Sequence, residues 1–497
     1  MMKNEVDILI IGEGTYPYIR GGVSSWIHQL ISGLKEFKFG ILFIGSRRED
    51  YDEKKYEFPE NVVFFDEIYI FDKQELPDPK RIKLKKEYYK QIEILHETFY
   101  KQENNKEDNL KLIENFIKNI SLEDFLYSNI SWDFIVNTYL KKYENESFID
   151  YFWTIRNMHI PLWEIFKIIE KIPKIKLVHS PSTGYAGFLA GLLKINRNIP
   201  YLLTEHGIYT RERKIDLLTS DWFSTKEKFF QDEEELLLKN IWNNFFESIG
   251  RFSYYTADKI LSLFERARLI QIEYGAPKDK TMVLPNGVNV NRLKESLKKR
   301  APKNPKVIGL IGRVVPIKDI KTFIKSMKIV NNKVPDAKGW IVGPTDEDTA
   351  YYEECKNLVK ALDLENIVEF LGFQNILDIF PKISINTLTS ISEGMPLSVL
   401  EGFAAGVPAV TTDVGSCFEL IYGGLNDEDK RLGSAGFVCK VANAKDLAQR
   451  YIQLLEDEEL WKSCQKVALE RVNRFYTQEL FFENYKKLYK EALSWQE

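Results

Sequence analysis

Two glutamates, Glu393 and Glu401, lie eight residues apart in the segment Glu-Gly-Met-Pro-Leu-Ser-Val-Leu-Glu. Pro396 is well placed to open a helix here, because its fixed φ angle suits a first helical turn. The first backbone amides of such a helix, in residues 397–399, have no partners within the helix and favour an anion such as a diphosphate. Glu393 would lie beside the group that the diphosphate carries, and Glu401 could accept hydrogen bonds from vicinal hydroxyls such as those of a ribose. The segment therefore suggests a nucleotide-sugar site, although two glutamates at this spacing are more often a solvated helix surface.

Two cations in an earlier segment strengthen this interpretation. Gly312 and Arg313 follow the apolar run Val307 to Ile311, and Lys318 comes five residues after Arg313. An arginine offers phosphate oxygens a two-pronged fork and a lysine offers a point charge, so together they would stabilise the negative charge on a departing diphosphate. Each cation alone would be interpreted as a surface residue, but with the glutamate pair they indicate an anion site.

The N-terminal segment supplies a glycine-rich loop. The apolar run Val6 to Ile11 is followed by Gly12-Glu-Gly-Thr-Tyr-Pro-Tyr-Ile-Arg and then by Gly21 and Gly22. Glycines there allow backbone amides to approach phosphate or sugar oxygens closely. A dinucleotide fingerprint needs a third glycine where Pro17 stands, and the Gly-Lys-Ser/Thr ending of a P-loop does not occur. An NAD-type site is therefore disfavoured.

Glu205 and His206 form a polar pair at the end of another predicted strand, Tyr201 to Glu205. An imidazole can donate to a sugar hydroxyl or to a developing charge at neutral pH. Glu205 suggests a further sugar contact at the same strand end. His179, which closes another predicted strand, has a weaker context, and Arg211 is interpreted as a solvated loop cation unless it binds acceptor anions.

The composition limits the partners. The 497 residues are 44% hydrophobic and 29% charged, as in ordinary globular proteins with a large core. A net charge of -4 without an extended run of Lys or Arg argues against nucleic acid. Since no run of about 18 apolar residues occurs, we expect no transmembrane segment and a cytoplasmic protein.

Alternating apolar runs and helical patterns predict an α/β protein of two doubly wound, Rossmann-like domains. The first spans residues 1–292 and carries a helical insertion at about 72–172, where aromatic residues such as Phe116 recur at helical spacing. A linker is predicted from Lys294 to Pro305. The second domain spans residues 306–475, and a helix in residues 476–497 could cross back to the first. Ligands bind outside the carboxyl ends of strands in such sheets, so two domains facing each other would enclose them in a cleft.

Several motifs together resemble those of the retaining glycosyltransferases of family 4, which have a GT-B fold: Gly21-Gly22, Glu205-His206-Gly207, Pro285-Asn286-Gly287-Val288, Gly312-Arg313 with Lys318, and Glu393 through Glu401. The resemblance covers almost the whole chain. More narrowly, residues 12–26 and 343–348 are similar to the cytoplasmic glycosyltransferases of Pel exopolysaccharide synthesis.

The resemblance implies a role for each matching residue. Arg313 and Lys318 would hold the donor diphosphate. Glu401 would hold the ribose and Glu393 the transferred sugar, with His206 near the reacting carbon. The remaining donor contacts would come from Gly21, Gly22, Gly312, Gly372, Phe373, Met395, Pro396, Leu397 and Ser398, with the base near Gly372 and Phe373. The acceptor side would include Tyr18, Glu205 and Arg211.

The same resemblance implies transfer of a sugar from a UDP-sugar, usually UDP-glucose, to a growing Pel-type exopolysaccharide, with no metal or other cofactor. The protein would act at the inner face of the cytoplasmic membrane beside membrane-embedded Pel components. No nucleophile is evident from the sequence, which favours a front-face path over a covalent intermediate.

Three alternatives stay open. A nucleotide-sugar 2-epimerase uses the same architecture, and a subunit that only binds a nucleotide-sugar could regulate a membrane synthase. A metal-dependent transferase could use Asp346-Glu-Asp348 or Asp427-Glu-Asp429, although acidic triplets in loops are usually solvated.

Overall fold

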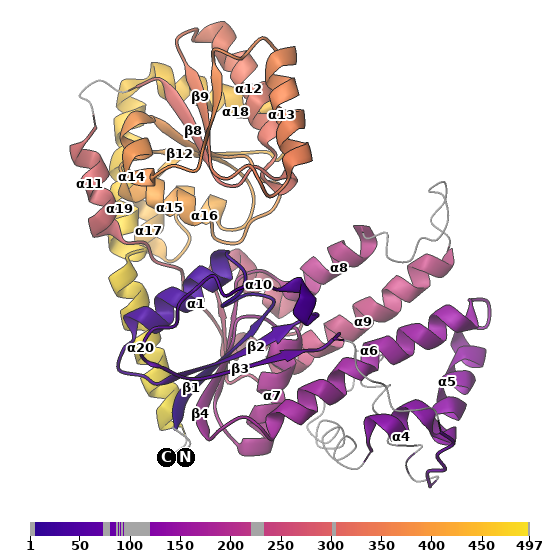
Figure 1. Cartoon of the computed structure of the whole chain (residues 1–497). Helices are drawn as coiled ribbons and strands as arrows, with labels where there is room; N and C mark the ends of the chain where they lie inside the picture. Colours follow the sequence, from indigo (N-terminus) through magenta and orange to yellow (C-terminus); the bar gives the residue numbers. More distant parts are fainter. Residues whose placement is uncertain are drawn as a thin grey trace. The chain divides into compact units, whose positions relative to one another are not determined.

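The computed structural model describes residues 5–72, 80–85, 88, 90, 93, 120–219, 233–300 and 305–495. The chain forms two compact α/β units, drawn in Figure 1. Unit 1 comprises Met1–Leu261, Ile270–Met282 and Leu488–Glu497, and unit 2 comprises Ser262–Leu269 and Val283–Lys487. Each unit is built around its own sheet.

Unit 1 is built on a seven-stranded sheet in the order β3-β2-β1-β4-β5-β6-β7. β1 pairs in parallel with β2 on one side and with β4 on the other, so the strand order reverses at β1 and β4. β1 is a nearly continuous apolar run because both faces of a parallel sheet are covered by helices. The strands are β1 (Val6–Glu13), β2 (Phe39–Gly45), β3 (Val62–Tyr69), β4 (Ile175–Ser180), β5 (Tyr201–Glu205), β6 (Lys259–Ser262) and β7 (Thr281–Val283).

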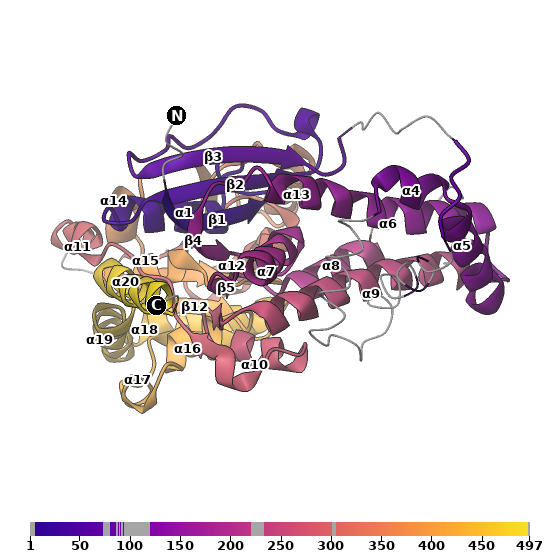
Figure 2. The ribbon, with the colours of Figure 1, turned by 90° about the horizontal axis from the view of Figure 1, so that it is seen from below.

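Helices cover this sheet and extend beyond it. Figures 1 and 2 both show α4, α5 and α6 reaching away from the strands, with α5 far from the sheet. Their aromatic side chains join the same hydrophobic core as the sheet. The helical segments are α1 (Gly22–Gly33), η1 (Arg48–Asp50), α4 (Leu122–Tyr127), α5 (Asn129–Lys142), α6 (Phe148–Ile169), α7 (Tyr185–Arg197), α8 (Tyr209–Thr219), α9 (Glu233–Thr256) and η2 (Lys278–Lys280). Helix α10 (Glu265–Glu273) is divided between the two units at Leu269.

The end of the C-terminal helix α20 (Gln478–Ser494) packs within unit 1. The Tyr489 hydroxyl and His179 Nδ1 are 2.8 Å apart, and the Tyr489 ring meets Phe37 edge-on. The other ring nitrogen of His179, Nε2, lies 2.8 Å from the Thr204 hydroxyl. His179 is therefore a structural histidine that joins α20 to β4 and β5.

Unit 2 contains a six-stranded sheet in the order β10-β9-β8-β11-β12-β13, and every neighbouring pair is parallel. The order reverses at β8 and β11, which makes the carboxyl ends of these strands the expected ligand site. The strands are β8 (Val307–Ile311), β9 (Lys338–Val342), β10 (Val368–Gly372), β11 (Ile385–Leu388), β12 (Ala409–Thr412) and β13 (Gly436–Cys439).

The helices of unit 2 pack on this sheet through two hydrophobic clusters, one including α15 and α19 and the other including α12, α13 and α18. The helical segments are α11 (Val290–Lys298), η3 (Pro316–Lys318), α12 (Ile320–Lys333), α13 (Thr349–Ala361), α14 (Ile376–Ile379), η4 (Phe380–Lys382), α15 (Leu397–Ala404), α16 (Cys417–Tyr422), α17 (Asp427–Arg431), α18 (Ala444–Glu456) and α19 (Glu458–Phe475).

The predicted linker from Lys294 to Pro305 is wrong in its first half. Helix α11 continues to Lys298, because Val290, Leu293 and Ser296 form a buried stripe under its charged surface. Phe116 and much of the predicted insertion lie outside the described residues. Among the helices that the structure describes, none carries an apolar stretch long enough to span a bilayer.

Candidate functional site

The predicted diphosphate ligands lie at the switch point of the second sheet. Gly312 and Arg313 follow β8, and the loop that they begin is fixed to the neighbouring strand by the Gly312 N–H, which donates to the Val342 carbonyl at 2.9 Å. Gly343 has a φ of +155°, and a Cβ there would lie 2.0 Å from the Gly312 carbonyl oxygen. The backbones after β8 and β9 therefore lie too close together for a side chain at position 343.

Arg313 makes an ion pair that sequence analysis did not predict. Its Nη1 lies 2.5 Å from Oε1 of Glu347, which belongs to the loop after β9. The two side chains are 52% and 48% exposed, so solvent reaches both. The guanidinium therefore stands at the carboxyl edge of the sheet with a carboxylate as its partner.

Lys318 is brought together with Glu393 as a more enclosed pair. The Lys318 ammonium donates to Glu393 Oε1, and the Ser390 hydroxyl donates to the same oxygen at 2.5 Å. The two charged side chains are 21% and 14% exposed. Asp319, at φ +44°, caps α12 by accepting from the Thr322 N–H at 3.2 Å, which fixes the turn that carries Lys318.

The loop after β11 ends at an amide-bearing helix terminus. Pro396 is the N-cap of α15 and supplies no side-chain cap. The Val399 N–H donates to the Pro396 carbonyl at 3.2 Å, which removes it from the predicted trio of available amides. Within the described part of the chain, the N–H groups of Leu397 and Ser398 have no hydrogen-bond partner. Two amides thus remain available to an anion at the positive end of the helix dipole.

Glu401 lies one turn further along α15, half-buried. Burial raises the pKa of its carboxyl to about 7, and the nearby charge of Arg292 opposes that rise in part. No hydrogen bond to the Glu401 carboxylate is found among the residues that the structure describes. The carboxyl group changes charge near neutral pH and has oxygens free to accept from a ligand hydroxyl.

The remaining predicted donor contacts of unit 2 differ in accessibility. Gly372 ends β10 with a φ of +64°, and no atom lies within 4 Å of a Cβ built there. Phe373, which follows it, is 83% exposed. Met395 is buried beneath the loop before α15, so it supports that loop from inside.

In unit 1, the glycine-rich loop leaves an open surface at the start of α1. Gly21 is the N-cap of this helix, without a side-chain cap. A Cβ built on Gly21 or Gly22 meets nothing within 4 Å. Both residues are exposed, so their backbone can be approached closely.

His206 is held against this loop by Trp26 of α1, whose ring meets the imidazole edge-on at 4.6 Å. Burial lowers the pKa of His206 to about 3, so the ring is neutral near pH 7. Its Nε2 is buried and finds no partner in the described part of the chain. A neutral imidazole with an unused nitrogen is suited to a hydrogen bond with an uncharged ligand group.

The predicted acceptor-side residues take three different environments. Glu205 is buried, and its carboxylate accepts from Tyr254 at 2.6 Å, Gln271 at 3.0 Å and Thr183 at 3.1 Å. Burial raises the pKa of Glu205 to about 7. Tyr18 is buried too, and its hydroxyl donates to Glu67. Arg211 is exposed on α8.

Glu205 and Tyr18 therefore direct their polar groups into unit 1. The predicted sugar contact by Glu205 does not fit this geometry, because a strand-end position does not reveal which way a side chain points. In unit 2, the chain brings Lys318 and Glu393 together, while Arg313 and the α15 terminus follow the neighbouring strands β8 and β11. It brings His206 and the Gly21–Gly22 loop together in unit 1 through Trp26.

Glu13 is a feature of unit 1 that sequence analysis missed. It ends β1, accepts from the Tyr209 hydroxyl at 2.8 Å and accepts from the Ala186 N–H at 3.0 Å. A Cβ at Gly184 would lie 2.5 Å from its carboxylate. Glu13 thus joins the loops after β1, β4 and β5. The sequence did offer one indication of a role for Glu13, because it lies between Gly12 and Gly14 in the glycine-rich segment.

The two acidic triplets serve the fold. Asp348 caps α13 by accepting from the Tyr351 N–H at 2.9 Å. Asp429 is fully buried and paired with Arg471 at 2.6 Å. In the described residues, no group of three or more His, Cys, Asp or Glu side chains is arranged to hold a metal ion.

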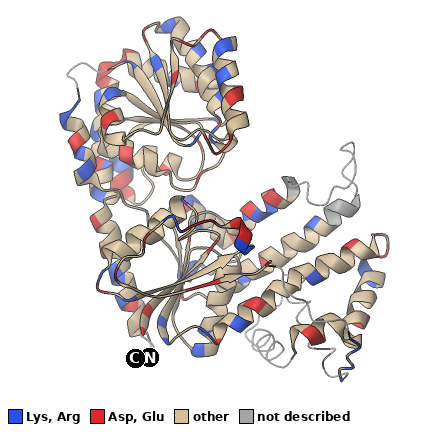
Figure 3. Ribbon diagram, in the orientation of Figure 1, with Lys and Arg blue, Asp and Glu red and all other residues tan. Residues whose placement is uncertain are grey.

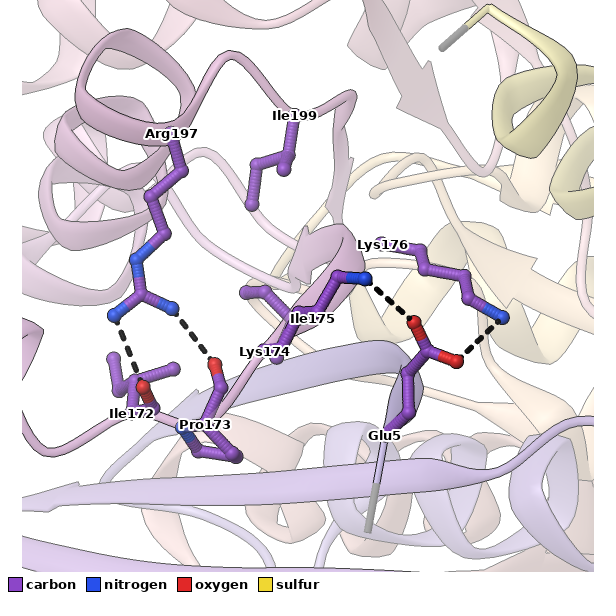
Figure 4. A pocket seen from close by; sticks show the side chains of 8 residues that line it. All are labelled: Glu5, Ile172, Pro173, Lys174, Ile175, Lys176, Arg197 and Ile199. Carbon is purple, nitrogen blue, oxygen red and sulfur yellow. Dashed lines mark hydrogen bonds and ion pairs between the residues drawn. The ribbon is translucent and has the colours of Figure 1, made fainter. Parts of the chain in front are cut away.

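A hollow at the opposite edge of the first sheet shows how a structural charge cluster differs from the candidate site (Figure 4). Glu5 pairs with Lys174 at 3.2 Å and with Lys176 at 3.5 Å. Arg197 donates to the Pro173 carbonyl at 2.7 Å and to the Ile172 carbonyl at 3.0 Å. These groups lie at the amino ends of the strands and bind one another, so they hold the sheet edge. Elsewhere, Figure 3 shows Lys and Arg interspersed with Asp and Glu on both units.

The two doubly wound sheets and a match of residues 291–471 to the family described as glycosyl transferases group 1 define the class. This is a glycosyltransferase with a GT-B fold, as the sequence predicted. The chain belongs to the family described as "Domain of unknown function (DUF3492)", which matches residues 6–279.

Individual relatives support the same class. The "Uncharacterized glycosyltransferase MJ1178" of Methanocaldococcus jannaschii is 27% identical over 332 residues, which are 65% of this chain and 75% of that protein. The N-acetyl-alpha-D-glucosaminyl L-malate synthase of Bacillus anthracis is 30% identical over 189 residues, 38% of this chain and 46% of that enzyme. The chain thus spans about half the length of the second relative.

Solved structures share the fold at low identity. Anabaena Alr3699/HepE in complex with UDP is 13% identical, with a TM-score of 0.58 and coverage of 98% of this chain and 100% of that one. Sucrose-phosphate synthase from Thermosynechococcus elongatus is 15% identical, with a TM-score of 0.56 and coverage of 98% and 99%.

Proposed function

We propose that this protein is a retaining glycosyltransferase of family 4 that transfers a sugar from a UDP-sugar. One observation carries the proposal: Lys318, Glu393 and the unpartnered amides of Leu397 and Ser398 converge after β8 and β11, where the strand order of the second sheet reverses. HepE, which has a similar fold, was solved with UDP and with UDP-glucose, which supports UDP as the nucleotide.

The donor diphosphate is assigned to Arg313, Lys318 and the α15 terminus. Glu401 accepts from the ribose hydroxyls, and Glu393 accepts from the transferred sugar, since its second carboxylate oxygen carries no bond to Lys318 or Ser390. The base lies near Gly372 and the exposed Phe373. Gly312, Met395 and Pro396 shape the loops that hold these groups.

Unit 1 is assigned ligand contacts of its own in this proposal. The open backbone at Gly21 and Gly22 is suited to a close approach by phosphate or sugar oxygens. The unused nitrogen of His206 is suited to donate to a sugar hydroxyl. Because burial lowers the pKa of His206 to about 3, it acts as a neutral hydrogen-bond donor and not as an acid.

The reaction proceeds by a front-face path. The bond between the sugar C1 and the phosphate oxygen breaks, and Arg313, Lys318 and the helix amides stabilise the negative charge on the leaving diphosphate. The acceptor hydroxyl attacks C1 from the same face and gives its proton to the departing phosphate oxygen. No metal ion is needed, because the cations and amides neutralise the leaving group.

We further propose that the donor is UDP-glucose and that the product is a Pel-type exopolysaccharide. The motifs at residues 12–26 and 343–348, which are similar to those of PelF, support this assignment. The enzyme would then work in the cytoplasm, peripherally at the membrane, beside the membrane-embedded components that export the polymer.

A donor panel tests the proposed function. UDP-, GDP- and ADP-sugars are ranked by thermal shift, since a ligand at a hundredfold excess over its Kd stabilises the folded state by about 2.7 kcal/mol. The best donor is then assayed with and without EDTA, and the products are analysed by NMR. We expect a UDP-sugar to rank first, an α-linked product and insensitivity to EDTA. A free epimerised sugar nucleotide would indicate an epimerase, and tight binding without transfer or hydrolysis would indicate a binding subunit.

A further inference from the structure

The ion pair with Glu347 engages Nη1 of the Arg313 guanidinium, the group that the proposed function assigns to the donor diphosphate. The backbone on either side of Arg313 is fixed to the end of β9 and the loop after it, because the Gly312 N–H donates to the Val342 carbonyl and the Val314 N–H donates to the Pro344 carbonyl at 3.0 Å. The side chains meet beyond the strand ends with a separation of 2.5 Å between Nη1 and Oε1. A phosphate reaching this guanidinium must therefore share it with a carboxylate or displace that carboxylate.

The Glu347 carboxylate caps no helix and is held by no second ion pair among the residues that the structure describes. In the described residues, its carboxylate bonds only to Arg313, and the neighbouring Asp348 is the residue that caps α13. The other carboxylate at this edge differs, because Glu393 is held by both Lys318 and Ser390 and is less exposed. Glu347 thus acts on Arg313 alone.

Carboxylate and phosphate oxygens compete for the same guanidinium N–H groups. A displaced Glu347 stays on its loop, where its negative charge repels the diphosphate. Removing that charge frees the fork and removes the repulsion. An exposed ion pair is worth about 0.2–1 kcal/mol, which converts to roughly a 1.4- to 5-fold change in affinity.

We propose that Glu347 sets the donor affinity of this site: it pairs with Arg313 in the unliganded protein and is displaced by the diphosphate of the donor. This inference rests on the proposed function, which assigns Arg313 to that diphosphate. Glu347 weakens binding of donor and of the product UDP alike, so it favours product release as well as limiting substrate capture.

The test is calorimetric titration of UDP into the wild-type chain and Glu347→Gln, which keeps the size of the side chain and removes its charge. We expect Glu347→Gln to bind UDP roughly two to five times more tightly at low ionic strength. The gain should shrink as salt is added, because salt screens exposed charges. In an Arg313→Ala background only the repulsion by the carboxylate remains, so Glu347→Gln should strengthen UDP binding less there than in the wild-type chain, and an equal gain in both would overturn the pairing.

Asp336→Asn is the matched control. Asp336 pairs with Lys306 at 2.9 Å, is 67% exposed and lies at the opposite, amino-terminal edge of the same sheet. Asp336→Asn changes the net charge by the same amount as Glu347→Gln. An equal gain in UDP affinity in both variants would therefore mean a general charge effect and would overturn the inference.

Unchanged or weaker UDP binding by Glu347→Gln would also overturn it, because the carboxylate would then position Arg313 for the ligand. If the wild-type chain binds no UDP while it remains folded by circular dichroism, the proposed function itself fails.

Discussion

The carboxyl edges of the two sheets use their polar groups in opposite ways. In unit 2, Arg313, Lys318 and the α15 amides lie where a ligand can reach them or displace their partners. In unit 1, the carboxylates of Glu13 and Glu205 are satisfied by neighbouring loops and helices, whereas His206 and the Gly21–Gly22 loop stay available. A polar residue at the end of a strand therefore does not by itself identify a ligand site. What matters is whether its polar group already has hydrogen-bond partners inside its own unit.

The largest effect is expected at Lys318. Lys318→Ala should lower kcat by about 10²- to 10³-fold, on the order of 3 kcal/mol, because the leaving diphosphate loses a preorganised cation. The rate at which UDP is formed during sugar transfer, at saturating donor and acceptor, measures kcat. Lys306→Ala, which removes an equally charged residue from the amino edge of the same sheet, should leave kcat within about twofold. A wild-type rate for Lys318→Ala would contradict the donor assignment.

The next effect concerns stability and sharpens the contrast with unit 1. Glu205→Ala should lower the free energy of unfolding by about 2 kcal/mol, because buried donors of Tyr254, Gln271 and Thr183 lose their acceptor. Urea unfolding measures the change. Asp216→Ala, which removes an exposed carboxylate of the same unit, should stay within about 0.5 kcal/mol. A stable but inactive Glu205→Ala would return Glu205 to the ligand site.

The third prediction concerns the pH dependence of donor binding through Glu401, the residue proposed to hold the ribose. Burial raises its pKa to about 7, whereas ribose hydroxyls are best accepted by the ionised form. Donor binding therefore favours loss of the proton, and affinity for UDP-glucose should rise several-fold as the pH increases through about 7. UDP-glucose suits this titration because its diphosphate, esterified at both ends, does not titrate there. Glu401→Gln should bind more weakly and lose the pH dependence. An equal pH dependence in that variant would assign the titration to another group.

The smallest effect is expected at Arg211, which is exposed on α8. Arg211→Ala should change the free energy of unfolding by less than about 0.5 kcal/mol and leave UDP affinity unchanged, since a solvated cation contributes little. Thermal unfolding and titration with UDP measure both quantities. A change confined to the KM for the acceptor would support the acceptor-side assignment, whereas a large loss of UDP affinity would break the contrast between the two units.

The sequence predicted the parts of the fold that have strong local patterns. β8 matched its prediction because five consecutive apolar or small residues, Val307–Ile311, mark a buried strand. β3 was missed because Val62–Tyr69 is a half-buried edge strand that contains Asp66 and Glu67. The second part of α11 was predicted as a linker because its charged residues, such as Lys294, Glu295 and Lys298, left only Ser296 of the buried stripe within that segment.

The candidate site shows the same limit. The convergence of Lys318 and Glu393 could be inferred because both follow strands of one α/β pattern. The pair of Arg313 with Glu347 could not, because it depends on β8 and β9 being neighbours in the sheet. Nor does a strand-end position indicate whether a carboxylate turns inward, as Glu205 does, or toward solvent.

A crystal structure of the chain with UDP would show whether these groups hold the diphosphate. We expect diphosphate oxygens within hydrogen-bond distance of Lys318 Nζ and the Leu397 and Ser398 N–H groups, with Arg313 turned from Glu347 toward the phosphates. UDP bound elsewhere, with these groups still facing solvent or their present partners, would contradict this expectation.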